Sequence, residues 1–144
     1  MGFNEVVGNM WDIEADAYCI TTNGFVKKNG KAVMGAGCAK EAATKWPLLP
    51  KVLGYHIQQE GNRVWCWGEN PKLVMFPVKH NWWEKADMDL ILESAYSLMA
   101  FVTMENWKKV LLPRPGCGNG KLNWEDVKAE LWPILDERVW IVSK

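Results

Sequence analysis

Neither sign of charge is in excess in this sequence: 17 lysine and arginine residues are matched by 17 aspartate and glutamate residues, and the formal net charge is zero. Proteins that hold bare DNA, RNA or an anionic membrane by electrostatic attraction usually carry a basic excess. The charge balance therefore argues against such a protein and leaves room only for a local basic patch.

Long hydrophobic runs are absent as well. A membrane-spanning helix needs about 20 consecutive, mostly apolar residues, and no segment of the sequence approaches that length. The opening residues MGFNEVVGN also lack the cationic and apolar regions of a secretory signal peptide. We therefore expect a cytoplasmic protein that does not contact a membrane.

Metal-binding residues are few. The four cysteines form no Cys-x-x-Cys pair and lie far apart, and the only histidines are His56 and His80. This spacing disfavours a zinc site, and free thiols fit the reducing cytoplasm. We expect neither a metal nor a cofactor.

Strand-like and helix-like segments alternate along the chain, without an internal repeat or linker. Short apolar runs predict strands at residues 3–7, 17–22, 63–67, 73–78, 110–112 and 138–142. Helical spacing predicts helices at 38–46 and 48–59, one capped by Asp87 that runs to about residue 105, and one capped by Asn123 that ends or kinks at Pro133. The alternation predicts an α/β fold: a single three-layer domain over residues 1–144, with a mixed or largely parallel sheet covered on both faces.

A glycine-rich loop lies between the second predicted strand and the first predicted helix. Asn23-Gly24 ends the strand, and Gly35-Ala36-Gly37 leads directly into the helix that starts at Cys38. Free N–H groups at a helix start, the helix dipole and the missing side chains together form a site for an anion such as phosphate. The alternative is that these glycines only turn the chain.

A second glycine-rich loop, Gly116-Cys117-Gly118-Asn119-Gly120, follows the apolar strand 110–112. Ligands of open α/β sheets bind beyond the carboxyl ends of the strands, so the two loops could hold a diphosphate between them. Neither loop matches the GxxxxGK[ST] pattern of a P-loop or the GxGxxG pattern of a dinucleotide site. Both of those sites are therefore disfavoured.

Four segments of the sequence together resemble a macro domain, a module that binds ADP-ribose. They are NG at 23–24, VMGAGCA at 33–39, FPVK at 76–79 and LPRPGCGNGKLNW at 112–124. The resemblance covers nearly the whole chain. The sequence is similar in particular to the branch of the family that includes the terminal ADP-ribose protein glycohydrolase and the antitoxin macro domains that remove ADP-ribose from DNA. It implies an α/β/α sandwich with a mixed central sheet.

The resemblance also implies a set of ligand-binding residues. Asn9 stands where the family usually has an acid that accepts from the adenine amino group, with Asp12 as a second candidate, and the N–H of Met10 would bind the ring. The remaining predicted ligand-binding residues surround the diphosphate: Met34, Gly35, Ala36, Gly37 and Cys38 on one side, and Gly116, Cys117, Gly118, Asn119 and Gly120 on the other.

Lys79 and Asn23 are the catalytic residues that the resemblance implies, both beside the distal ribose. An amine can add to the anomeric carbon, or its ammonium can stabilise the leaving group, especially if desolvation lowers its pKa. The alternative for Lys79 is an ordinary surface lysine. The protein glycohydrolase has a catalytic acid where this chain has Gly120, and this difference favours a nucleic acid or another small acceptor over a protein.

The function expected from these residues is hydrolytic removal of ADP-ribose from a modified macromolecule, either a nucleic acid or a protein. The alternatives are a non-catalytic module that binds ADP-ribose or a related nucleotide, and a phosphatase acting on ADP-ribose 1″-phosphate. Trp82 and Trp83, just after a predicted strand, are the tryptophans that we expect to face the ligand. We expect a monomer.

Overall fold

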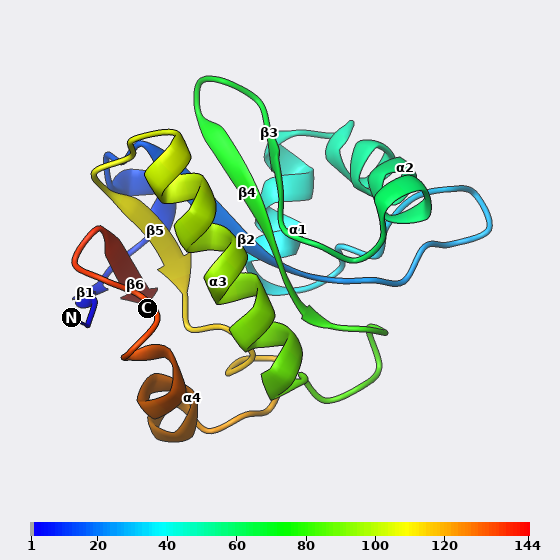
Figure 1. Cartoon of the computed structure of the whole chain (residues 1–144). Helices are drawn as coiled ribbons and strands as arrows, with labels where there is room; N and C mark the ends of the chain where they lie inside the picture. The colour runs from blue at the N-terminus through cyan, green and yellow to red at the C-terminus, as the bar shows by residue number, and fades with distance from the viewer. Residues whose placement is uncertain (1) are drawn as a thin grey trace.

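A six-stranded sheet forms the centre of the protein, which a computed structural model describes over residues 2–144 (Figure 1). The strands lie in the order β1-β6-β5-β2-β4-β3. All neighbouring strands are parallel except β3, which pairs antiparallel with β4. The predicted mixed sheet is therefore confirmed. The strands are β1 (Asn4–Val7), β2 (Ala17–Asn23), β3 (Trp65–Trp67), β4 (Lys72–Lys79), β5 (Val110–Pro113) and β6 (Val139–Ser143).

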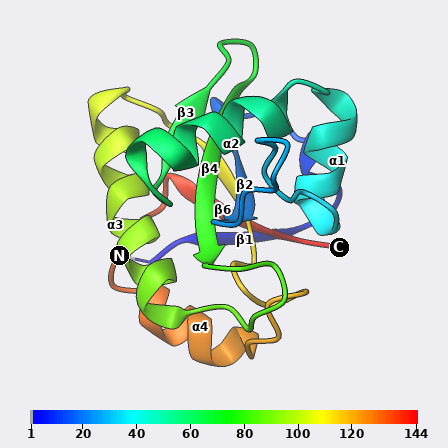
Figure 2. The same cartoon turned by 90° about the vertical axis from the view of Figure 1, so that its right-hand side faces the viewer.

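Helices cover both faces of this sheet (Figure 2). They are α1 (Gly37–Lys45), α2 (Leu49–Glu60), α3 (Met88–Met104) and α4 (Trp124–Leu131), with a short 3-10 helix η1 (Met10–Asp12) after β1. One hydrophobic cluster joins the sheet to α3 and α4, and a second joins it to α1 and α2. The three-layer α/β/α sandwich is confirmed.

The inner strand β4, between β2 and β3, shows why a nearly continuous apolar sequence forms this sheet. Its residues are buried from Leu73 to Lys79. Val74 and Phe76 pack in the cluster with α3 and α4, whereas Leu73 and Met75 pack in the cluster with α1 and α2. Successive side chains of a strand point to opposite faces, so a strand covered on both sides needs apolar residues at every position.

Capping residues fix the helix boundaries where the sequence predicts them. The Asp87 carboxylate accepts a hydrogen bond from the Asp89 N–H at the start of α3, and the Asn123 side chain accepts from two N–H groups at the start of α4. Gly61, with φ 93°, ends α2. The helix η1 was not predicted, because three residues are too few to show a hydrophobic period.

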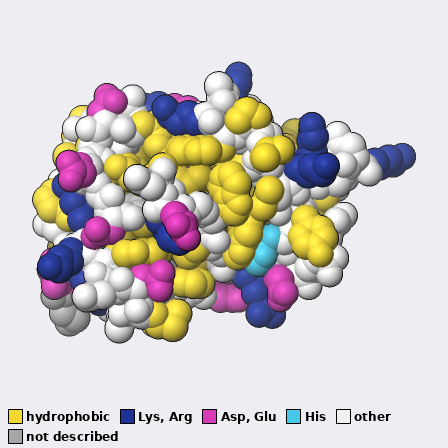
Figure 3. Space-filling model, turned by 90° about the horizontal axis from the view of Figure 1, so that it is seen from above, with side chains coloured by type: hydrophobic (Ala, Val, Ile, Leu, Met, Phe, Trp, Pro, Cys, Tyr) yellow, Lys and Arg dark blue, Asp and Glu magenta, His cyan; other side chains and the backbone are white. Residues whose placement is uncertain are grey.

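The five parallel strands end at one edge of the sheet, since the carboxyl ends of parallel strands point the same way. The arrows of β4 and β5 in Figure 1 point down toward this edge. Figure 3 shows the molecule from above, and so from the side opposite to this edge. On that face, basic and acidic side chains are interspersed around exposed hydrophobic atoms. Within residues 2–144 no helix combines the length and the hydrophobicity needed to cross a membrane.

Candidate functional site

A cavity of about 1050 Å³ lies along the carboxyl edge of the sheet. Each of the five parallel strands contributes to its lining at or just beyond its last residues, and both glycine-rich loops line it as well. The strand-end residues of the lining are Gly8 after β1, Val142 in β6, Pro113 in β5, Thr21, Thr22 and Asn23 in β2, and Val78 and Lys79 in β4. The sequence predicts a ligand site beyond the carboxyl ends of the strands, and the structure has a large cavity at that place.

The two glycine-rich loops approach each other across this cavity. A β-carbon added to Gly37 would lie 3.7 Å from Nδ2 of Asn119, whereas one added to Gly35 or Gly118 would have no atom within 4 Å. Ala36, the N-cap of α1, makes no side-chain capping hydrogen bond. The first N–H groups of a helix have no intrahelical partner, so the start of α1 can bind an anion beneath open glycine backbone.

Two glycines of the second loop, Gly116 and Gly120, line the cavity and are also required for packing. A β-carbon on Gly120 would lie 2.5 Å from the carbonyl oxygen of Gly116, and one on Gly116 would lie 2.8 Å from Cδ1 of Ile91. Gly116 also has a φ of 75°, which favours glycine. An acidic side chain at position 120 would therefore clash with the backbone of its own loop. The loop as it is packed here has no room for an acid at this position.

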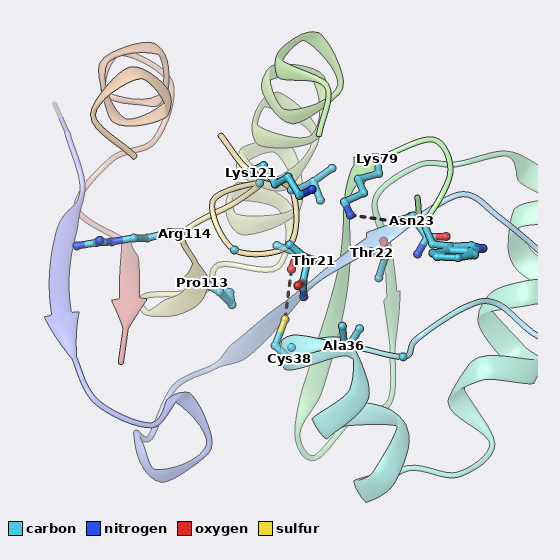
Figure 4. Close-up of a pocket in the computed structure, with 18 of the residues that line it drawn as sticks. Thr21, Thr22, Asn23, Ala36, Cys38, Lys79, Pro113, Arg114 and Lys121 are labelled. Carbon is cyan, nitrogen blue, oxygen red and sulfur yellow. Dashed lines mark hydrogen bonds between the residues drawn. The ribbon is translucent and has the colours of Figure 1, made fainter. Parts of the chain in front are cut away.

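Lys79, at the end of β4, brings a basic group into the cavity wall (Figure 4). Its side chain is only 8% exposed, and Nζ donates a hydrogen bond of 3.1 Å to the carbonyl oxygen of Trp82. Burial, together with the nearby positive charge of Lys121, lowers the pKa of the Lys79 amine. Because desolvation disfavours the ammonium form, Lys79 is closer to a free amine than an ordinary surface lysine is.

Asn23 lies opposite Lys79 in the pairing of β2 with β4 and also lines the cavity. Its Nδ2 donates to the carbonyl oxygen of Val33 at 3.0 Å, and its Oδ1 accepts from the N–H of Phe25 at 2.9 Å. Both bonds fix the loop between β2 and α1. The first role that the structure gives Asn23 is therefore to position that loop, with one amide hydrogen left over.

Trp82 and Trp83, the pair that we expect to face the ligand, line the cavity next to Lys79. Their exposed fractions are 53% and 58%, and the Trp83 ring packs edge-on against Phe25, with ring centroids 5.3 Å apart. His80 is not part of the cavity lining. Its Nε2 lies 2.7 Å from Oδ2 of Asp87 at the start of α3, so it contacts a helix cap and not the site.

The structure brings most of the predicted site residues together. Eleven of them line the cavity: Met10, Asn23, Gly35, Ala36, Gly37, Cys38, Lys79, Gly116, Gly118, Asn119 and Gly120. Asn9, Met34 and Cys117 do not. Asn9 caps η1 by accepting from the Trp11 N–H at 3.1 Å, Met34 is buried against α1 and α2, and Cys117 lines a smaller adjoining pocket.

Several lining residues were not singled out from the sequence. Glu41 lies one helical turn beyond Gly37, so helical spacing could have indicated it. Lys121 directly follows the second loop, and its φ of 64° is unusual for a residue other than glycine. Lys144 lies just beyond β6 and had no sequence signal.

The site has no cluster of metal ligands: over the described residues 2–144, no three His, Cys, Asp or Glu side chains are grouped so that they could hold an ion. Cys38, a predicted site residue of the first loop, brings a thiol into the cavity lining. Its Sγ lies 3.3 Å from Oγ1 of Thr21 (Figure 4). Burial raises the pKa of the Cys38 thiol, so it meets a ligand as a neutral group.

Comparison with known proteins gives matches in structure only. No family model and no curated protein matches the sequence. The macrodomain of Mycobacterium tuberculosis DarG matches with a TM-score of 0.82 at 20% identity, over 99% of this chain and 97% of that one. The macrodomain of Thermus aquaticus DarG matches with a TM-score of 0.79 at 22% identity, over 99% and 97%. Thermosipho africanus DarTG, solved in complex with ADP-ribose, matches with a TM-score of 0.81 at 18% identity, over 98% of this chain and 42% of that one. This chain has the macrodomain fold.

Proposed function

We propose that the cavity binds ADP-ribose and that Lys79 removes this group from a modified macromolecule. The observation that carries the proposal is the position of Lys79, a buried lysine with a lowered pKa at one end of a cavity lined by two facing glycine loops. A buried basic group beside an open ligand cavity is a candidate for chemistry, because lysines are rarely buried and groups with shifted pKa values cluster at functional sites.

The extent of the cavity supports an elongated ligand. Its lining runs from Gly8 after β1 to Lys79 at the end of β4, and these strands are separated by four strand spacings, or about 19 Å. A dinucleotide-like molecule can then place its base near β1 and β6, its diphosphate over the start of α1 and its distal ribose beside Lys79. The Thermosipho neighbour in complex with ADP-ribose supports this choice of ligand.

The lowered pKa of Lys79 supports a nucleophilic amine. The amine lone pair would form a bond to the anomeric carbon of the distal ribose as the bond from that carbon to the acceptor breaks, and the acceptor would leave with the proton that the amine gives up. Water would then add to the anomeric carbon, which breaks the bond to lysine, regenerates the amine and releases ADP-ribose. The hydrogen bond from Nζ to the Trp82 carbonyl holds the amine in place.

The acceptor side of the cavity favours a flat group such as a nucleobase. Trp82 and Trp83 expose about half of their surface there, and aromatic side chains stack on bases. The close packing at Gly120 leaves no room for the loop acid on which the protein glycohydrolase depends. We therefore propose ADP-ribosylated nucleic acid as the first substrate to test and ADP-ribosylated protein as the second.

The first experiment is calorimetric titration with ADP-ribose, with ADP and AMP as controls. The proposal predicts that ADP-ribose binds at least about tenfold more tightly than ADP, because only ADP-ribose reaches Lys79. Equal affinity for all three would mean that the distal ribose is not recognised. No binding of ADP-ribose would overturn the proposal, although the fold would stand.

The second experiment separates catalysis from binding alone. Lys79→Ala is expected to abolish release of ADP-ribose from ADP-ribosylated DNA or protein, while its affinity for free ADP-ribose stays within about threefold of the original. Turnover at the original rate in this variant would exclude Lys79 as the catalytic residue. If the unchanged protein binds ADP-ribose but releases none from any substrate, the site belongs to a binding module.

A further inference from the structure

One carboxylate faces the end of the cavity formed by β1 and β6. Two acidic side chains belong to the cavity lining, Glu41 and Glu84. Glu84 lies in the loop after β4, near Lys79 and the two tryptophans. Glu41 lies on α1 and bonds to Lys144, just beyond β6, so it belongs to the opposite end. Under the proposed function, this is the end that receives the base.

Two hydrogen bonds hold the Glu41 carboxylate. Oε1 accepts from the indole Nε1 of Trp11 at 3.0 Å, and Oε2 accepts from Nζ of Lys144 at 2.8 Å. The Lys144 side chain is 75% exposed, and such exposed pairs are weak. The indole is the firmer anchor, because its ring stacks on Tyr18 and packs against Trp46, with centroid distances of 5.8 and 5.5 Å.

This carboxylate keeps unused acceptor sites in the cavity wall. An ionised carboxylate has about four lone-pair sites, and Trp11 and Lys144 use two of them. Both contacts also lower the pKa of Glu41, which keeps it in the acceptor-only form. Asn9 is a poorer hydrogen-bond acceptor for a ligand, because its side-chain oxygen already accepts from the Trp11 N–H and Asn9 does not line the cavity.

The surface around Glu41 suits a flat heterocycle. Met10 and Val142 line the same end of the cavity and form one hydrophobic cluster, against which Trp11 and Cys38 pack. Apolar walls with one charged acceptor are typical of a pocket that fixes the orientation of an aromatic ring through a single polar contact.

We propose that Glu41 selects the base of the bound nucleotide by accepting a hydrogen bond from the exocyclic amino group of adenine. The inference rests on the proposed binding of ADP-ribose. Hypoxanthine carries a carbonyl oxygen where adenine carries the amino group, and two acceptors facing each other repel. Glu41 therefore favours adenine over hypoxanthine, and Trp11 acts as a positioning residue that aims the carboxylate.

The test compares the affinities for ADP-ribose and for its hypoxanthine analogue, inosine diphosphate ribose, by calorimetry. The unchanged protein is expected to prefer ADP-ribose by about tenfold, the discrimination typical of one charged hydrogen bond. In Glu41→Gln the amide can donate to the hypoxanthine carbonyl as well as accept, so the preference should fall to about twofold or reverse. Glu14→Gln is the matched control. It makes the same change of charge at an exposed residue that lies outside the cavity lining.

The outcomes separate this inference from the function on which it rests. Binding of ADP-ribose without discrimination against the hypoxanthine analogue, or an undiminished preference in Glu41→Gln, overturns the role of Glu41 and leaves the proposed function intact. Failure of the unchanged protein to bind ADP-ribose overturns both. If Glu41→Gln does not fold, the comparison of the two ligands on the unchanged protein can still overturn the inference, because the inference requires the tenfold preference there.

Discussion

Asn23 pairs with Lys79 across β2 and β4, one position out of step with the pairing before it. Thr22 pairs with Pro77, and the register then shifts so that Val78 has no partner in β2. An extra residue in one strand bends it and re-aims the side chains that follow. Pro77 has no N–H to donate, but its carbonyl oxygen accepts from Oγ of the buried Ser94 in α3 at 2.8 Å. The bulge therefore places Lys79 at the cavity while α3 holds the strand.

The buried amine of Lys79 should make the stability of the fold depend on pH. Its pKa in the folded protein is below the ordinary value of 10.5, so between the two values the unfolded chain binds more protons than the folded one. The free energy of unfolding then rises with pH over this interval, by up to about 1.4 kcal/mol for each unit by which the pKa is lowered. The buried ammonium form destabilises the folded protein fully at pH values below the folded pKa. This destabilisation is lost as the pH rises from the folded pKa to the unfolded pKa.

Lys79→Met removes this titration. Urea unfolding of both proteins at several pH values between neutral and about 10 should show the unchanged protein gaining stability relative to the variant as the pH rises. The difference between the two curves isolates Lys79 from all other titrating groups. Parallel curves would contradict the lowered pKa.

Lys79→Arg distinguishes the two ways in which a lysine could act on the anomeric carbon. Arginine keeps the positive charge but does not lose its proton in proteins, so it cannot form a bond to carbon as an amine does. We expect a loss of turnover of at least about 100-fold, with ADP-ribose affinity little changed. Substantial turnover by this variant would show instead that the positive charge alone stabilises the leaving group.

The sequence predicts those features of the fold that depend on neighbouring residues. Apolar runs marked the strands, and Asp87 and Asn123 marked two helix starts that the structure confirms. The two glycine loops could be placed at one cavity because parallel strands end at the same edge. These features follow from local chemistry plus one rule of topology.

The features that escaped prediction depend on contacts between distant parts of the chain. Helical spacing places Glu41 one turn beyond Gly37, but it does not reveal the hydrogen bond to the Glu41 carboxylate from the indole of Trp11, 30 residues earlier. The bulge at Val78 arises in the pairing of two strands and is invisible in either strand alone. Asn9 resembled a base-binding residue, but the structure uses its side chain to cap a helix too short to detect.

Trp82→Ala should weaken binding of the acceptor, the group that carries ADP-ribose, and leave binding of ADP-ribose itself nearly unchanged. The hydrogen bond from Lys79 goes to the backbone oxygen of Trp82, so loss of the ring leaves the amine in place. Loss of one stacked base typically costs about 1–3 kcal/mol, which corresponds to a KM for ADP-ribosylated DNA that is higher by roughly fivefold or more. Affinity for free ADP-ribose should change by less than about threefold, as measured by calorimetry.

Tyr96→Ala is the control for Trp82→Ala, because Tyr96 is a similarly exposed aromatic residue on α3 outside the cavity lining. It should leave both the KM and the affinity unchanged. If Trp82→Ala and Tyr96→Ala have the same effect on the KM, the ring of Trp82 does not contact the acceptor.

Alanine substitution of single glycines should separate ligand binding from folding within the two loops. Gly118 and Gly35 have open space where a β-carbon would be, whereas at Gly120 it would lie 2.5 Å from the Gly116 carbonyl oxygen. Gly118→Ala and Gly35→Ala should therefore keep the original Tm and lose about tenfold or more in ADP-ribose affinity, because the new methyl group occupies space that a phosphate would use. Gly120→Ala should instead lower the stability by about 1–3 kcal/mol through overpacking. Thermal unfolding and calorimetry on the three variants measure the two effects separately. An unchanged ADP-ribose affinity in both Gly118→Ala and Gly35→Ala would place the diphosphate outside these loops, whatever the stability of Gly120→Ala.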